Sequence, residues 1–163
     1  MTQAGESFFE ALQELQPDVD LVILPPERPV VAPYADRDEA IASARGTAAV
    51  VEALLVEALL VESGIDVLHR SIHERWDRQQ DDVHVHVSRA RVDHGDSHSG
   101  IETLLRVGDV LAGGGWQPES VDSPTPWIVA TSPTGQRADV AVEGSQLVIT
   151  ITSAPLRLKD DPQ

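Results

Sequence analysis

The chain has 163 residues, 41% of them hydrophobic, which is enough for one domain with a buried core and too few for two comfortable ones. Its 27 acidic and 12 basic residues give a formal net charge of −15, and this field repels nucleic-acid phosphates and anionic membranes. Binding to nucleic acid or to a membrane is therefore not expected, although an acidic surface can mimic DNA. The lack of cysteine excludes disulfides and a thiol nucleophile.

Residues 1–35 are predicted to form a short helix and a proline-rich connector. The helix is expected from about Glu6 to Gln16, and Pro17 ends it. Residues 21–24 form an apolar run that suits an edge strand, and four prolines then favour an extended connector. This region has neither the basic segment nor the long apolar run of a signal peptide, so a cytoplasmic location is expected.

A single domain is predicted over residues 36–155, and its first element is a long helix at about 36–63. Asp36 and Glu39 have the spacing of a capping box. Gly64 suits the left-handed residue that ends a helix, although the apolar pattern also permits a longer helix. One face of the predicted helix carries residues at alternating steps of four and three, which indicates a core-facing stripe: Ala40, Ala44, Thr47, Val51, Leu54, Ala58 and Val61.

Within this helix the repeat VEALLVEALL, residues 51–60, places apolar side chains outside the stripe. Leu55, Val56, Leu59 and Leu60 fall on flanks that a surface helix usually leaves polar. Either the N-terminal segment or a second copy of the chain is expected to cover them. We expect a homodimer with these four residues in the interface, because a two-fold interface lets one apolar surface cover itself.

The second half of the chain is predicted to be a sheet interrupted by one helix. Residues 67–77 are expected to pair with residues 82–92 through a polar turn. Ser99 and Glu102 have capping-box spacing at the start of a helix over about 99–112, which three glycines end. Four short strands joined by tight turns then predict an antiparallel meander: residues 116–121, 127–131, 137–142 and 147–152.

These elements predict a two-layer α+β domain. Its antiparallel sheet of five to six strands is expected to be covered on one face by the helices at about 36–63 and 99–112. Residues 156–163 are expected to be an acidic tail.

The histidines are the one group of residues that suits a chemical site. His84 and His86 share a strand face, and His94 and His98 follow in a polar segment, so these four are the candidate ligands for zinc or a similar metal. No H-E-x-x-H motif is present, and solvated histidines on the outer face of the sheet are the favoured interpretation. No cofactor is therefore expected.

The order of elements resembles a poorly characterised group of actinobacterial proteins, many of them predicted lipoproteins. The resemblance covers roughly residues 40–155. It rests on the long helix ending in Ser63-Gly64, on the strand with Trp76, on Gly114-Gly115-Trp116 and on the final LVITITSAP at residues 147–155. Exported members of that group carry a lipid-attachment cysteine, which this sequence lacks. The resemblance implies a helix-plus-sheet fold and no known activity.

The sequence contains no phosphate-binding loop and no nucleophile elbow, so an enzyme is not expected. The favoured function is that of an acidic binding or assembly module, which associates with itself or holds a protein partner as a small chaperone or immunity-type protein does. The alternative is a small-molecule or metal-binding protein that uses the sheet face and the region from His84 to His98.

Overall fold

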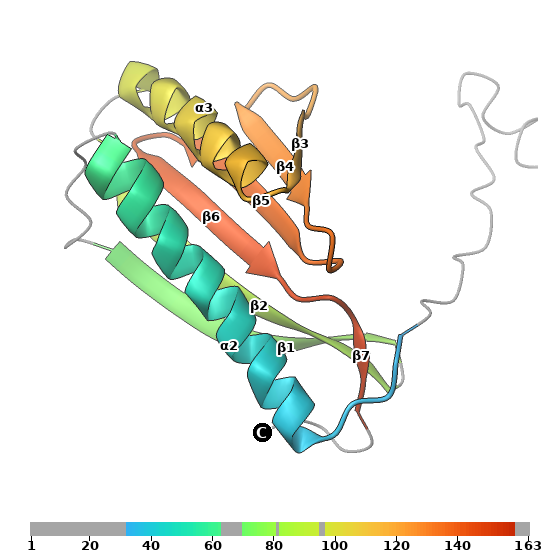
Figure 1. The fold of residues 1–163 in the computed structure, drawn as a ribbon. Helices are drawn as coiled ribbons and strands as arrows, with labels where there is room; N and C mark the ends of the chain where they lie inside the picture. Colours follow the sequence, from blue (N-terminus) through green and yellow to red (C-terminus); the bar gives the residue numbers. More distant parts are fainter. Residues whose placement is uncertain (1–31, 63–69, 81, 95–96, 159–163) are drawn as a thin grey trace, which may run out of the picture.

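The computed structural model describes residues 32–62, 70–80, 82–94 and 97–158, which form two helices and an antiparallel sheet (Figure 1). The elements in chain order are α2 (Arg37–Leu54), η1 (Leu55–Glu62), β1 (Arg70–Gln80), β2 (Val83–Asp93), α3 (Ser97–Gly113), β3 (Gln117–Ser120), β4 (Trp127–Thr131), β5 (Arg137–Glu143), β6 (Gln146–Thr152) and β7 (Leu156–Arg157).

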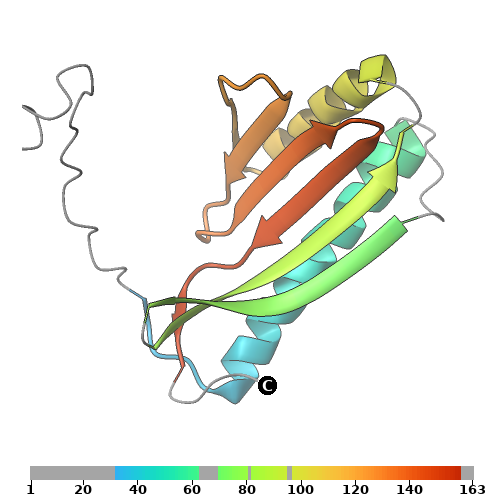
Figure 2. The ribbon, with the colours of Figure 1, turned by 180° about the vertical axis from the view of Figure 1, so that it is seen from behind.

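The sheet has the strand order β1-β2-β6-β5-β4-β3, and the short β7 pairs with β2. Neighbouring strands are antiparallel throughout. Short connections join β3, β4, β5 and β6 in a meander, and its last strand, β6, pairs with β2. Both helices lie on the same face of the sheet (Figure 1). In the opposite view the sheet is nearer to the viewer and the helices lie behind it (Figure 2). The predicted two-layer α+β class is therefore confirmed, with seven strands in the described sheet.

The long helix begins as predicted and then changes its type. Asp36 accepts a hydrogen bond from the Glu39 backbone N–H, and the Glu39 side chain accepts one from the Asp36 backbone N–H, both at 2.9 Å. The α-helix continues to Leu54, and residues 55–62 form a π-helix, the type with hydrogen bonds between residues five apart. This π-helix covers the whole second half of the VEALLVEALL repeat, residues 56–60.

The helix α3 starts at Ser97, two residues before the predicted cap, so Ser99 lies inside the first turn of the helix and not at its N-cap. Its end agrees with the glycine-rich prediction. The Trp116 N–H bonds to the Leu111 carbonyl and the Gly115 N–H to the Ala112 carbonyl, both at 3.0 Å. Gly115 has a φ of 82°, the left-handed conformation that this helix ending requires and that glycine adopts without strain.

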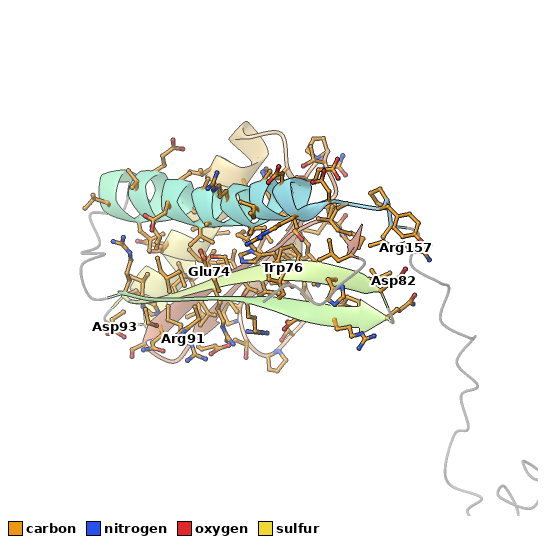
Figure 3. The ribbon with its side chains drawn as sticks, turned by 90° about the horizontal axis from the view of Figure 1, so that it is seen from below. Glu74, Trp76, Asp82, Arg91, Asp93 and Arg157 are labelled. Atoms are coloured by element: carbon orange, nitrogen blue, oxygen red, sulfur yellow. The ribbon has the colours of Figure 1, made fainter. Side chains whose placement is uncertain are left out.

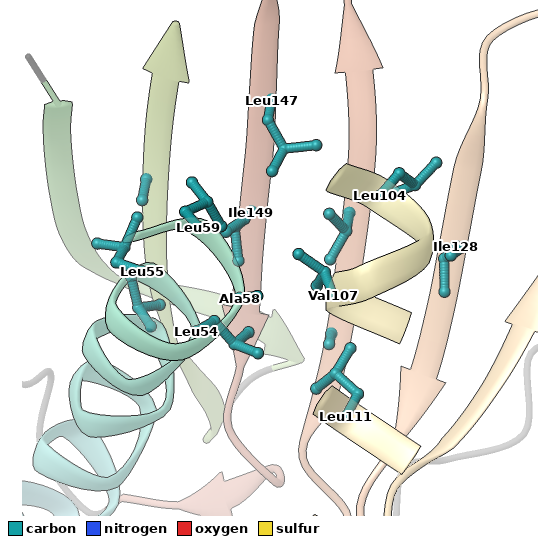
Figure 4. Packing of buried hydrophobic residues seen from close by; sticks show 14 of the residues in the cluster. Leu54, Leu55, Ala58, Leu59, Leu104, Val107, Leu111, Ile128, Leu147 and Ile149 are labelled. Carbon is teal, nitrogen blue, oxygen red and sulfur yellow. The ribbon is translucent and has the colours of Figure 1, made fainter. Parts of the chain in front are cut away.

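The core lies between the two helices and the sheet (Figure 4). It consists of aliphatic residues, and its largest fully buried side chains are supplied by η1 and β6: Leu55, Leu59, Leu147, Ile149 and Ile151. Four predicted stripe residues, Ala40, Val51, Leu54 and Ala58, are among the buried apolar residues. Burial of this kind of surface is the main force that holds the helices on the sheet.

The C-terminal prediction requires a correction, because residues 156 and 157 form β7 and not part of an acidic tail. The Arg157 backbone forms hydrogen bonds with two residues that precede α2. Its N–H donates to the Pro33 carbonyl at 2.8 Å, and its carbonyl accepts the Ala35 N–H at 2.9 Å. The folded unit therefore includes residues 32–35, which the sequence placed in the connector. The predicted N-terminal helix, the strand at 21–24 and the helix stop at Gly64 lie outside the described residues.

Candidate functional site

The strand β2 turns its histidines toward the helix layer, which reverses the predicted orientation. The cross-strand pair Trp76 and His86 lies on the face that α2 covers, and Ile72 opposite Ala90 on the same face packs against the core. Figure 3 shows Glu74 and Trp76 on the side of the strands that faces α2, and Arg91 and Asp93 on the other side. His84 and His86 are each only 4% exposed, so the interpretation as solvated histidines was wrong.

The orientation could not be read from the alternation, because both faces of this part of β2 are buried. All six residues from Val83 to Ser88 are buried, and the valines lie on the face opposite to the helices. A period of two shows which residues share a face but not which face the helices cover.

His86 forms the centre of a polar cluster between α2 and the sheet. Its Nδ1 lies 2.5 Å from the Thr47 hydroxyl, which donates its own proton to the Ala44 carbonyl at 2.8 Å. The hydroxyl has a single proton, so when this proton is donated to the Ala44 carbonyl, Nδ1 is the donor to Thr47 and Nε2 keeps the lone pair of the neutral ring. The Trp76 ring meets the imidazole edge-on, with the ring centroids 5.3 Å apart.

Hydrogen bonds to the main chain join this cluster to the end of β6. The Ser153 hydroxyl accepts the His86 N–H at 2.9 Å and donates to the Ala154 carbonyl at 2.8 Å. Next to His86 on the same face, the fully buried Ser88 hydroxyl has no hydrogen-bond partner among the described residues. Buried polar groups usually have such partners, so this cluster departs from an ordinary aliphatic core.

Burial lowers the pKa of His86, and the nearby Glu74 carboxylate offsets only part of this effect. The native ring is therefore neutral at neutral pH. In the unfolded chain a histidine takes up its proton below about pH 6.5, so the unfolded state binds more protons than the native state as the pH falls below that value. Stability should be constant above this pH with respect to His86 and should fall as the solution becomes more acidic.

We expect His86→Asn to weaken this pH dependence of stability, since the asparagine amide keeps a hydrogen-bond donor near Thr47 and does not ionise. Chemical denaturation between about pH 7 and pH 5, where an unperturbed histidine gains its charge, measures the effect. His73→Asn is the matched control because His73 is exposed on β1. The hypothesis fails if the free energy of unfolding declines with acid equally in the wild type and in His86→Asn.

His94 is buried at the other end of β2, beneath the first turn of α3. It is 7% exposed, and neither ring nitrogen has a hydrogen-bond partner among the described residues. A methyl group added at Gly100 would come within 2.5 Å of the His94 ring. The glycine therefore allows the helix to rest directly on the imidazole.

The four candidate ligands do not form one site. His86 and His94 are eight residues apart along an extended segment, which corresponds to roughly 27 Å. No three histidine, aspartate or glutamate groups of the described residues are placed to hold a metal ion, and the His98 side chain lies outside the description. His84, His86, His94 and His98 are therefore not arranged as the ligands of one metal ion.

The predicted interface residues separate into two pairs. Leu55 and Leu59 are fully buried in the chain's own core, so their assignment to an intermolecular interface was wrong. Val56 and Leu60 remain 46% and 48% exposed. Leu55 and Leu59 are four residues apart, as are Val56 and Leu60, and side chains at this spacing share one side of a helix, so the first pair faces the sheet while the second does not.

The exposed pair borders the first strand of the sheet. Glu52, Val56 and Leu60 follow one another at steps of four on one side of the helix. The Glu52 carboxylate lies 3.4 Å from the Arg70 guanidinium at the start of β1, so this side of the helix faces β1. Val56, Leu60 and the outer edge of β1 are together called the β1-side surface below.

A second exposed apolar pair lies on the opposite flank of the helix layer. Ile101 and Leu105 of α3 are 42% and 59% exposed. Gly108 continues this side of α3, and its nearest contact is with Ile128 of β4, on the far side of the sheet from β1. The two exposed pairs therefore belong to different surfaces.

The strand β1 ends the sheet, because among the described strands it pairs only with β2. Its eleven residues leave one row of backbone N–H and C=O groups without a strand beside it in the described part of the chain. Such an edge can take up an extended segment of another chain.

No helix among the described residues is long and apolar enough to span a membrane. No protein-family model, no curated protein and no solved structure matches the chain.

Proposed function

We propose that this chain is a non-enzymatic, acidic protein-binding module that uses the β1-side surface. The observation that carries the proposal is the exposure of Val56 and Leu60, at 46% and 48%, beside an eleven-residue strand that has one edge unpaired among the described strands. Apolar groups and strand edges that remain in contact with water are characteristic of surfaces that bind other proteins.

The two parts of the surface contribute in different ways. Fully burying a large aliphatic side chain is worth roughly 1.5–3 kcal/mol, so Val56 and Leu60 supply affinity. The edge of β1 supplies main-chain hydrogen bonds and a defined direction for the bound segment. The formal charge of −15 opposes indiscriminate aggregation through this surface and favours partners that do not carry the same charge where they bind.

The polar cluster at His86 is assigned a structural role in this proposal. Thr47 and Ser153 use their hydroxyl groups to bond the ring and the main chain, so they connect α2 to β2 and to the end of β6. This arrangement favours a rigid scaffold over a reacting centre, and a small chaperone or immunity-type protein is the kind of module that it fits.

A photo-crosslinking amino acid at position 60, introduced in the cells that express the protein, tests the proposal. We expect a discrete protein adduct from position 60, because that side chain lies on the β1-side surface. The same amino acid at position 105 is the matched control, since Leu105 is even more exposed but lies on the other flank. The proposal is wrong if position 60 gives no protein adduct, or if both positions give the same adducts in equal yield.

A further inference from the structure

The outer edge of β1 has a charge pattern that is complementary to itself. Residues 74–78 read Glu-Arg-Trp-Asp-Arg, so the charges run negative, positive, neutral, negative, positive. When a second copy of this segment runs in the opposite direction, with Trp76 opposite Trp76, every charge meets its opposite. Arg75 then faces Asp77 of the second copy, and Glu74 faces Arg78 of the second copy.

The faces of the strand agree with this pairing. In the sheet, Glu74, Trp76 and Arg78 lie on the helix-covered face, opposite Ser88, His86 and His84 of β2. Arg75 and Asp77 lie on the other face, where the guanidinium Nε is 2.7 Å from the carboxylate. Residues that meet across an antiparallel edge must share a face, and both complementary pairs fulfil this condition.

We propose that two copies of the chain join their β1 strands antiparallel across a two-fold axis at Trp76. This inference rests on the proposed function, because it names a second copy as the partner at the β1-side surface. The two sheets become one continuous sheet, and the helix layers of both copies lie on the same side of it. Arg75 and Asp77 from each strand then form one group of four alternating charges.

Neighbouring registers are disfavoured by the same residues. Centring the pair on Arg75 or on Asp77 places two like charges directly opposite each other, and centring it on Glu74 does so at Glu74 and again at Arg70 and Arg78. In the remaining registers an even-numbered residue would stand opposite an odd-numbered residue of the second copy. Such residues lie on opposite faces of the strand, and the pleat forbids this pairing. Among the registers centred on one of residues 74–78, the Trp76-centred register is thus the one in which no like charges of these residues meet directly.

Sedimentation velocity of charge-reversed variants tests the inference. The variants Arg75→Asp and Asp77→Arg each place like charges across the two-fold axis, so each should raise the dimer dissociation constant at least about tenfold. An equimolar mixture of the two should form a heterodimer, because one chain then carries acidic side chains at both positions and meets a chain that carries basic side chains at both. The double variant Arg75→Asp/Asp77→Arg should dimerise like the wild type.

The inference is overturned if the wild type remains monomeric at about 100 µM, where a complex with a micromolar dissociation constant would be saturated. It is also overturned if either single variant dimerises as the wild type does, or if the mixture stays monomeric. Recovery in the mixture shows at the same time that both single variants are folded. A monomeric wild type that still gives an adduct with another protein from position 60 would remove this inference and leave the proposed function intact.

Discussion

Replacing Leu59 with alanine is expected to lower the free energy of unfolding by about 2–5 kcal/mol, the usual cost of truncating a fully buried leucine. Leu59 is 0% exposed and lies in the core between η1 and the sheet (Figure 4). The cost combines the lost burial of the side chain with the cavity that remains in a tightly packed interior.

Leu60→Ala is the matched control, because the neighbouring leucine is 48% exposed and its loss leaves no internal cavity. Its effect on stability should stay within about 1 kcal/mol. Urea denaturation followed by circular dichroism measures both variants. Equal destabilisation by the two substitutions would contradict the burial of Leu59 and the exposure of Leu60.

The strands and turns were predictable from the sequence because their determinants are local. The strand at 127–131 has the predicted bounds, and β5 and β6 each differ by one residue at one end. In the turn between β4 and β5, Gly135 donates to the Ser132 carbonyl at 3.0 Å, as its place in Ser-Pro-Thr-Gly suggests. By contrast, β7 has only two residues and so offers no alternation to detect.

The polar cluster was not predictable because its contacts are tertiary. Thr47 and His86 are 39 residues apart, and neither residue has a neighbour in the sequence that indicates the other. Thr47 was assigned to the helix stripe and is fully buried as expected, but the same burial makes its hydroxyl the partner of a histidine that was expected on the outer face. The error concerned which face of β2 is covered, and hydrophobic alternation does not contain that information.

The charge pattern of β1 shows a different relation between sequence and structure. The letters Glu-Arg-Trp-Asp-Arg are visible in the sequence, but their self-complementarity has a physical meaning only for a strand with an unpaired edge. The topology supplies this condition by placing β1 at the end of the described sheet. Charges of this kind on an edge usually prevent indiscriminate pairing, and here their order favours the register centred on Trp76.

Substitution of Gly100 by alanine is expected to destabilise the protein by about 1–3 kcal/mol, although the same change within a helix usually stabilises by up to about 1 kcal/mol. The added methyl group would lie 2.5 Å from one ring carbon of His94 and 2.7 Å from Nε2. Because His94 is 7% exposed, its ring has little room to move, and the first turn of α3 must shift away from the sheet.

The variant Gly46→Ala provides the matched control for the ordinary helix effect. Its added methyl group meets only the Gln136 amide at 3.6 Å, which is a normal van der Waals distance, so thermal and urea denaturation should show a stabilisation. In the background of His94→Ala, where the obstructing ring is removed, Gly100→Ala should lose its penalty and become neutral or stabilising. A double-mutant cycle without coupling between positions 94 and 100 would show that the helix does not rest on the imidazole.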